Sequence, residues 1–110
     1  MKSVKLVVIY PRPKDVDAFE HVYQTEHVPL AVARLNGKTK MVATEVLASP
    51  QGTAPFYRFQ RFTFPRCKPW RNALRRIGGK EALAHAVKIS SSGPPSFLVG
   101  EEETFTFTKH

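Results

Sequence analysis

The sequence Val-Lys-Leu-Val-Val-Ile-Tyr, at residues 4–10, decides which fold the chain can adopt. Its residues are mostly β-branched or aromatic, and apolar side chains occupy both of its alternating faces. A strand of this kind is buried on two sides and therefore lies in the middle of its sheet. Pro11 and Pro13 come directly afterwards and are expected to end the strand.

A helix is predicted to follow this strand. Asp15 can cap it, since an aspartate side chain accepts hydrogen bonds from the first free N–H groups of a helix. Pro29 disfavours the helical conformation at Val28, so the helix should stop or kink near His27. A second short helical piece is expected over residues 30–35, before a turn at Asn36 and Gly37. The apolar positions at helical spacing are Val16, Phe19, Val22 and Tyr23.

The remaining elements complete a β-α-β-β-α-β order. Strands are predicted over residues 41–47, 56–64 and 97–107. A helix with apolar positions at Trp70, Ala73, Leu74 and Ile77 should break at Gly78 and Gly79, and a second helical piece should bury Ala82, Leu83, Ala86 and Val87. This order predicts an α+β, ferredoxin-like fold as a single domain over residues 1–110, with a four-stranded antiparallel sheet and both helices on one face.

The other face of that sheet is not expected to meet water alone. Phe59 should lie on the opposite face of its strand from Phe62 and Phe64, and the strand at residues 4–10 is also apolar on both sides. A second sheet packed about 10 Å away would cover such a face. The sequence therefore predicts a homodimer.

Composition narrows the functional classes. The chain has 110 residues, is 42% hydrophobic and carries a formal net charge of +8. No apolar run approaches the roughly 20 residues of a membrane span, and no signal peptide is evident, so a cytoplasmic protein without membrane contact is expected. Cys67 is the single cysteine, which excludes an internal disulfide. At the start of a helix, Cys67 is interpreted as a small capping residue rather than a reactive thiol.

Nucleic-acid binding is the less favoured alternative. The basic stretch at residues 66–80 is interpreted as the solvated face of a helix, without aromatics beside its arginines to stack bases. The aromatic strand at residues 57–64 invites comparison with RNA-recognition domains. Their signature places Gly or Ala between the aromatics, whereas this chain has Gln60 and Arg61.

His27 is the leading candidate for chemistry. Phe19, Tyr23 and His27 are spaced four residues apart, so they share the apolar face of the helix and His27 points inward. A histidine there could act as a general acid or base, or it could be a core residue that bonds a free carbonyl at the helix end. Tyr23 and Phe19 could contact a ligand, and Tyr10 and Tyr57 could line a pocket. His21 lies about 240° around the helix from His27, so no metal site is predicted, and no cofactor motif is found.

The first helix also resembles a known family. Residues 19–30 read FEHVYQTEHVPL, followed by LNG at residues 35–37. This run resembles the EthD family, whose members show an F-x3-[YW]-x3-H-x-P-L pattern after a first strand, then a glycine turn. The resemblance covers residues 4–48, and residues 97–101 agree loosely. The matching positions are Phe19, Tyr23, His27, Pro29, Leu30 and Gly37.

The resemblance implies a dimeric α+β barrel, in which two ferredoxin-like subunits pack sheet to sheet and often exchange their final strands. It also implies a role beside degradative chemistry, since the family takes its name from ether degradation. The wider relatives include cofactor-free monooxygenases, cyclases and isomerases that act on small hydrophobic or aromatic compounds. The chain departs from the family pattern at residues 90–93, where Ser-Ser-Ser-Gly replaces an acid often found before the last strand. We therefore expect cofactor-independent acid/base chemistry centred on His27, with a non-catalytic carrier of such a metabolite as the alternative.

Overall fold

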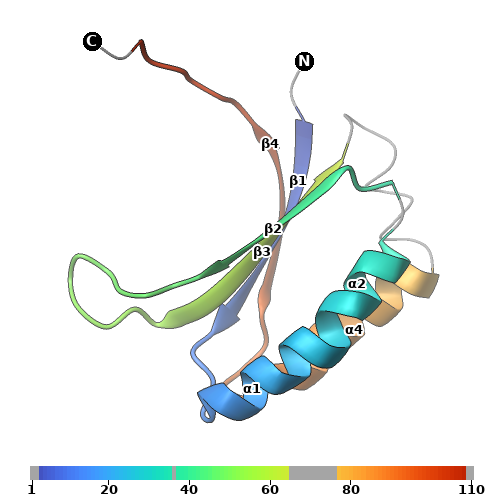
Figure 1. Cartoon of the computed structure of the whole chain (residues 1–110), viewed down its shortest axis with the longest axis vertical. Coiled ribbons are helices and arrows are strands. Elements are labelled where there is room, and N and C mark those ends of the chain that lie inside the picture. The colour runs from blue at the N-terminus through green and yellow to red at the C-terminus, as the bar shows by residue number, and fades with distance from the viewer. Residues whose placement is uncertain (1–2, 36, 65–76, 109–110) are drawn as a thin grey trace.

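The central strand is β1, as its two-sided apolar sequence predicts. The computed structural model describes residues 3–35, 37–64 and 77–108. Within them a four-stranded antiparallel sheet has the order β2-β3-β1-β4 (Figure 1). The strands are β1 (Ser3–Pro11), β2 (Lys40–Glu45), β3 (Phe56–Phe64) and β4 (Ser96–Glu102).

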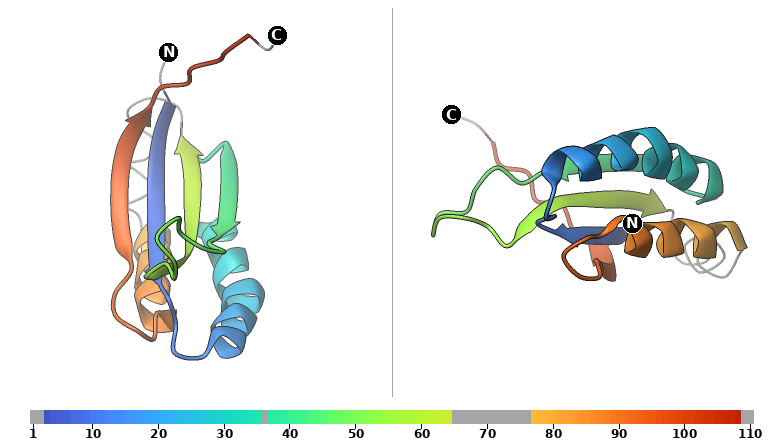
Figure 2. Two further views of the ribbon diagram at one scale, coloured as in Figure 1. Left: turned by 90° about the vertical axis from the view of Figure 1, so that its left-hand side faces the viewer. Right: turned by 90° about the horizontal axis from the view of Figure 1, so that it is seen from below.

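The helices pack on one face of this sheet (Figure 2). A continuous helical stretch follows β1, and α4 packs against its second half. The described helices leave the other face of the sheet open. The predicted ferredoxin-like α+β fold is therefore confirmed. The helical segments are α1 (Val16–Val22), the π-helical turn η1 (Tyr23–His27), α2 (Val28–Arg34) and α4 (Ile77–Ile89).

The chain stays helical past His27, so of the predicted stop or kink the stop does not occur. The turn η1 widens the helix by one residue, and the Val28 N–H bonds the carbonyl of Tyr23, five residues earlier. Pro29 has no N–H to donate to residue 25, so a wider turn at this point sacrifices no hydrogen bond of Pro29. The sequence thus locates the irregularity, and the structure shows that it is a π turn inside a longer helical stretch.

Three further expectations are corrected. α4 contains Gly78 and Gly79 without a break, because a cost of about 1 kcal/mol for each helical glycine is small beside the burial of the same helix. Val87 is 47% exposed and not on the buried side of α4. The last strand ends at Glu102, which pairs with Ser3 of β1, so residues 103–108 do not belong to the strand that was predicted to reach residue 107. The predicted positions at Asn36, Cys67 and Trp70–Leu74 lie outside the described residues.

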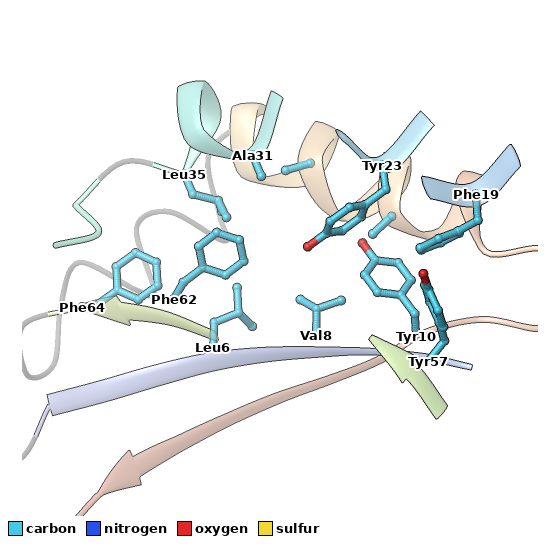
Figure 3. Close-up of a cluster of buried hydrophobic side chains, with 12 residues drawn as sticks. Leu6, Val8, Tyr10, Phe19, Tyr23, Ala31, Leu35, Tyr57, Phe62 and Phe64 are labelled. Atoms are coloured by element: carbon cyan, nitrogen blue, oxygen red, sulfur yellow. The ribbon is translucent and has the colours of Figure 1, made fainter. Parts of the chain in front are cut away.

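The core fills the space between the sheet and the helices (Figure 3). Alternate residues of β1, namely Leu6, Val8 and Tyr10, point toward the helices, and Tyr10 is completely buried. A β-bulge between Tyr10 and Pro11 adds one residue to β3, which turns Tyr57 into the core beside Tyr10. The same core cluster also includes Phe19, Tyr23, Ala31, Leu35, Phe62, Phe64, Ala82 and Ala86.

An ion pair joins α1 to β3 beside the β-bulge, at the edge of this core. Arg58 is 7% exposed, and its guanidinium pairs with the Glu20 carboxylate and lies 4.6 Å from the centre of the Tyr23 ring. The Tyr57 hydroxyl donates to the same carboxylate at 2.9 Å. These contacts fix α1 and η1 over the bulged end of β3, where the candidate site lies.

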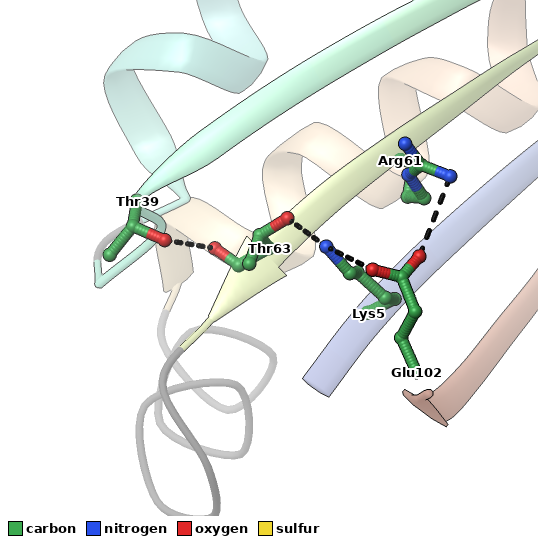
Figure 4. Close-up of polar contacts among 5 residues, drawn as sticks. All are labelled: Lys5, Thr39, Arg61, Thr63 and Glu102. Atoms are coloured by element: carbon green, nitrogen blue, oxygen red, sulfur yellow. Dashed lines mark hydrogen bonds and ion pairs between the residues drawn. The ribbon is translucent and has the colours of Figure 1, made fainter. Parts of the chain in front are cut away.

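The open face of the sheet is mixed in character. Cross-strand pairing places Phe59 opposite Ile9, and Phe62 opposite Leu6, so Phe59 faces away from Phe62 as predicted. A polar network lies on this open face (Figure 4), in which the Lys5 ammonium donates to the Thr63 hydroxyl at 2.6 Å. The Glu102 carboxylate lies 3.1 Å from Lys5 and 3.5 Å from Arg61. None of the described helices is long and apolar enough to cross a membrane.

Candidate functional site

The structure gathers all five site residues predicted from the sequence. His27 is 2% exposed, and its Nε2 atom lies 3.0 Å from the Tyr10 hydroxyl. Tyr10 meets the rings of Phe19 and Tyr23 edge-on, with centroids 5.2 and 5.9 Å apart, and Phe19 meets the Tyr57 ring at 5.7 Å. Figure 3 shows the four aromatic rings together at one end of the core. The predicted inward direction of His27 is what brings it to Tyr10.

His85 extends this cluster toward the surface. Its Nδ1 atom lies 3.0 Å from Nδ1 of His27, and the two ring planes differ by 12°. On the other side of the His85 ring, Nε2 lies 3.8 Å from a carboxylate oxygen of Glu26. The groups therefore form a chain that runs from the buried Tyr10 through His27 and His85 to the exposed Glu26.

Burial sets the protonation states at the inner end of the chain. It raises the pKa of Tyr10 far above the usual 10, so the phenol keeps its proton. The pKa of His27 falls from 6.5 to about 4, first because burial disfavours the charged ring and second because His85 lies beside it. Burial likewise raises the pKa of Tyr23 to about 12. His27 is therefore neutral at pH 7 and carries one N–H.

These constraints select one tautomer. The Tyr10 hydroxyl has no other hydrogen-bond partner in the described part of the chain, so donation to Nε2 of His27 is the arrangement that uses its proton. The proton of His27 is then on Nδ1 and is donated to Nδ1 of His85. His85 consequently carries its proton on Nε2, facing the Glu26 carboxylate. The reverse assignment would leave two acceptors facing each other at Glu26, and so it is disfavoured.

The space beside His27 is too small for a metabolite. A cavity of about 10 Å³ lies between α2, α4 and the sheet, and its lining includes His27 and Gln60. One water molecule needs roughly that volume. The fully buried Gln60 carboxamide makes no hydrogen bond of good geometry within the described residues, although it lies near enough to Tyr23 and His27 to influence the pKa of both. A ligand must therefore bind elsewhere.

A groove of about 370 Å³ lies between α1 and the end of α4. This volume falls in the range of small-molecule sites, about 300–1,000 Å³. His85 and Glu26 both line the groove, whereas His27 does not. His85 is thus the link between the buried pair and the space where a small molecule fits. The other lining residues are Lys14, Asp15, Ala18, Phe19, Val22, Lys88, Ile89 and Ser91.

The fold and this arrangement define an α+β protein with a ferredoxin-like architecture. More particularly, the chain is similar to an ethyl tert-butyl ether D (EthD) family protein from Bacillus halodurans C-125. The two share 29% identity with a TM-score of 0.84 over 92% of this chain and 99% of the other. The resemblance to the EthD family that the first helix predicts is thereby confirmed.

More distant likenesses concern the fold alone. A dimeric ferredoxin-like protein of unknown function from Jannaschia sp. CCS1 is 15% identical, with a TM-score of 0.63 over 94% of this chain and all of the other. SnoaB, a cofactor-independent oxygenase from Streptomyces nogalater, is 13% identical, with a TM-score of 0.59 over the whole of both chains. No protein-family model and no curated protein matches the chain.

Sequence reasoning missed two groups of this site. His85 lies between Ala84 and Ala86, a local pattern that does not distinguish it from a residue at the boundary of the packed helix face. Ala82 and Ala86 are buried, so His85 lies at the edge of the packed face of α4. The spacing of His85 from these two alanines is the signal that could have identified it. Glu26 precedes His27 and carries no distinguishing pattern. Among the described residues, no group of three or more histidine, cysteine or acidic side chains could hold a metal ion.

The depressed pKa of His27 predicts a pH-dependent stability. An unfolded histidine takes up its proton near pH 6.5 and the folded one near pH 4, so the unfolded state binds more protons between these values. The contribution of His27 is therefore fully present above pH 6.5 and is lost as the pH falls toward 4. We expect the wild type to lose about 2 kcal/mol from this residue between pH 7 and 4.5. His27→Gln should lack that loss in urea unfolding at the two pH values.

The matched control is His21→Gln, because His21 is exposed on the preceding turn of the same helical stretch. It should retain the wild-type difference between pH 7 and 4.5. An unchanged pH dependence in His27→Gln would contradict the buried, neutral state of His27.

Proposed function

We propose that the protein acts on a small hydrophobic or aromatic metabolite in a degradative pathway, by acid/base chemistry that requires no cofactor. The observation that carries this proposal is the hydrogen-bonded chain from Tyr10 through His27 to His85, which ends in a groove of about 370 Å³. The sequence-based hypothesis centred the chemistry on His27. The geometry favours a positioning role for His27, and we propose His85 and Glu26 as the reacting groups.

The arrangement at the groove suits removal of a proton next to a carbonyl group. Glu26 offers a carboxylate as the base, and the Nε2–H of His85 lies 3.8 Å from it as a hydrogen-bond donor. The carboxylate takes the C–H proton, the electron pair of that bond moves toward the carbonyl oxygen, and His85 stabilises the negative charge that develops there. Tyr10 and His27 hold His85 in the tautomer that this donation requires.

The similarities support the proposal at the level of the scaffold. The EthD-family protein shares the fold over nearly the whole chain, and SnoaB is described as a cofactor-independent oxygenase on the same fold. A shared fold does not carry a reaction with it, so the specific chemistry rests on the four side chains of the site.

The proposed step predicts exchange of carbon-bound hydrogen with solvent. Small aromatic ketones such as acetophenone and 2-indanone, incubated with the protein in D₂O, should lose their α-proton NMR signals faster than in buffer. Glu26→Gln removes the base and His85→Gln removes the donor, so each should slow exchange on the order of 100-fold or more. Tyr10→Phe should cause a smaller loss and alter the pH profile, since it frees the tautomer of His27.

His21→Gln is the control, because this exposed side chain is not part of the groove lining or of the hydrogen-bonded chain. Full exchange activity in Glu26→Gln or His85→Gln would refute the proposed roles. Binding of the ketones without any exchange would instead favour the carrier alternative.

We also propose that two copies pair through their open sheet faces. Leu98 pairs with Val7 on that face and is 53% exposed, and the polar network of Lys5, Arg61 and Glu102 lies beside it. Residues 103–108 lead away from the sheet (Figure 1), and Phe105 is 72% exposed among them. An uncovered face with these apolar groups is typical of an interface.

Pairing predicts a dimer in sedimentation velocity at micromolar concentration. Leu98→Glu should yield a monomer, because it places an unpaired charge on an apolar position of the proposed interface. Leu47→Glu should leave the dimer intact, since this leucine is 85% exposed in the connection between β2 and β3. A wild-type monomer would contradict the proposed pairing.

A further inference from the structure

The groove between α1 and α4 carries two lysines without ion-pair partners. Lys14 lies in the turn before α1, and Lys88 lies in the last turn of α4, so the two approach the groove from different elements. Neither ammonium group forms an ion pair or hydrogen bond with the described residues. The backbone N–H of Lys14 donates to the Ser91 hydroxyl at 3.1 Å, which ties the turn to the loop after α4.

The acids in the groove are already engaged. The Asp15 carboxylate accepts a hydrogen bond from the N–H of Ala18 at 3.1 Å as the cap of α1. Glu26 faces His85 as described above. Neither of these carboxylates pairs with Lys14 or Lys88 among the described residues, in a chain whose net charge is +8. The two ammonium groups can therefore each accept a negatively charged group of a ligand.

The same groove has an apolar lining. Phe19 is buried and belongs to the core, and Val22 and Ile89 are partly buried beside it. A ligand in the groove can thus place an apolar body against these three side chains while a charged group reaches the lysines. A neutral, fully apolar ligand would leave both ammonium groups without a partner.

We infer that the ligand is a small amphiphilic anion, with an aromatic or alicyclic body on Phe19, Val22 and Ile89 and an acidic group, such as a carboxylate, between Lys14 and Lys88. This assignment names the substrate class for the groove of the proposed function and rests on the groove being the binding site. It does not depend on the proton-transfer step, so binding alone can test it.

Two matched dyes test the inference directly. 8-Anilinonaphthalene-1-sulfonate carries a negative charge, and N-phenyl-1-naphthylamine has the same ring system without it. Fluorescence titration should show that Lys14→Met combined with Lys88→Met weakens binding of the anionic dye about 3- to 10-fold, as expected for two partly exposed ion pairs. Binding of the neutral dye should change less than twofold. The effect on the anionic dye should shrink as salt is raised.

The control is Lys40→Met combined with Lys80→Met, which removes the same charge from exposed positions on β2 and α4 outside the groove. It should leave affinity for the anionic dye within twofold of the wild type. An equal loss in both double variants, or no loss in either, would overturn the inference, since the dye would then sense net charge or bind elsewhere.

The outcome is separable from that of the proposed function. Dependence on the groove lysines without hydrogen exchange in any ketone would support an anion-binding groove and argue against the enzyme. Hydrogen exchange without dependence on the groove lysines would support the enzyme and overturn the anionic ligand.

Discussion

The hydrogen bond between the Tyr10 hydroxyl and Nε2 of His27 is the contact on which the candidate site depends. It joins the end of the central strand to the π turn, and it lies where burial keeps the phenol protonated and the imidazole neutral. His27 is the one acceptor within the described residues for the proton of the Tyr10 phenol. If Nε2 of His27 accepts that proton, the proton of His27 is on Nδ1 and the proton of His85 is on Nε2. A hydrogen bond of modest net stability thus determines which atom His85 presents to the groove.

The surrounding structure makes this contact possible. The β-bulge turns Tyr57 into the core beside Tyr10, and the pair of Arg58 with Glu20 holds the helical stretch over the bulge. The π turn sets the direction of His27 at the point where Pro29 could not supply a backbone hydrogen bond in any case. The β-bulge and the π turn therefore lie at the same site. Both kinds of irregularity are frequent at functional sites.

Most of the fold could be predicted from local patterns. The two-sided apolar strand at residues 4–10 identified the centre of the sheet, and β3 has the predicted bounds of Phe56–Phe64. The length of the last strand could not be predicted, because residues 103–108 have strand-like composition, and the pairing of β4 with β1, which ends at Glu102 and Ser3, is not contained in a local pattern. The glycines of α4 were misleading for a similar reason, since tertiary packing outweighs a local propensity of about 1 kcal/mol.

The inner half of the site could be predicted and the outer half could not. The four-residue spacing of Phe19, Tyr23 and His27 reports one helix face, so it shows that His27 points inward. His27 and His85 are 58 residues apart in the sequence, and their contact depends on how their two helices pack against each other. No local sequence pattern contains that information. The groove is likewise a product of that packing, and so is the presence of both Lys14 and Lys88 in its lining.

The tautomer of His27 tests the central claim most directly. Long-range ¹H–¹⁵N correlation NMR at pH 7, with His27→Gln used for assignment, distinguishes protonated from unprotonated ring nitrogens. We predict a single neutral form of His27 with the proton on Nδ1 and an unprotonated Nε2 that accepts the Tyr10 hydrogen bond. A proton on Nε2, or a charged ring at pH 7, would contradict the proposed order of the chain.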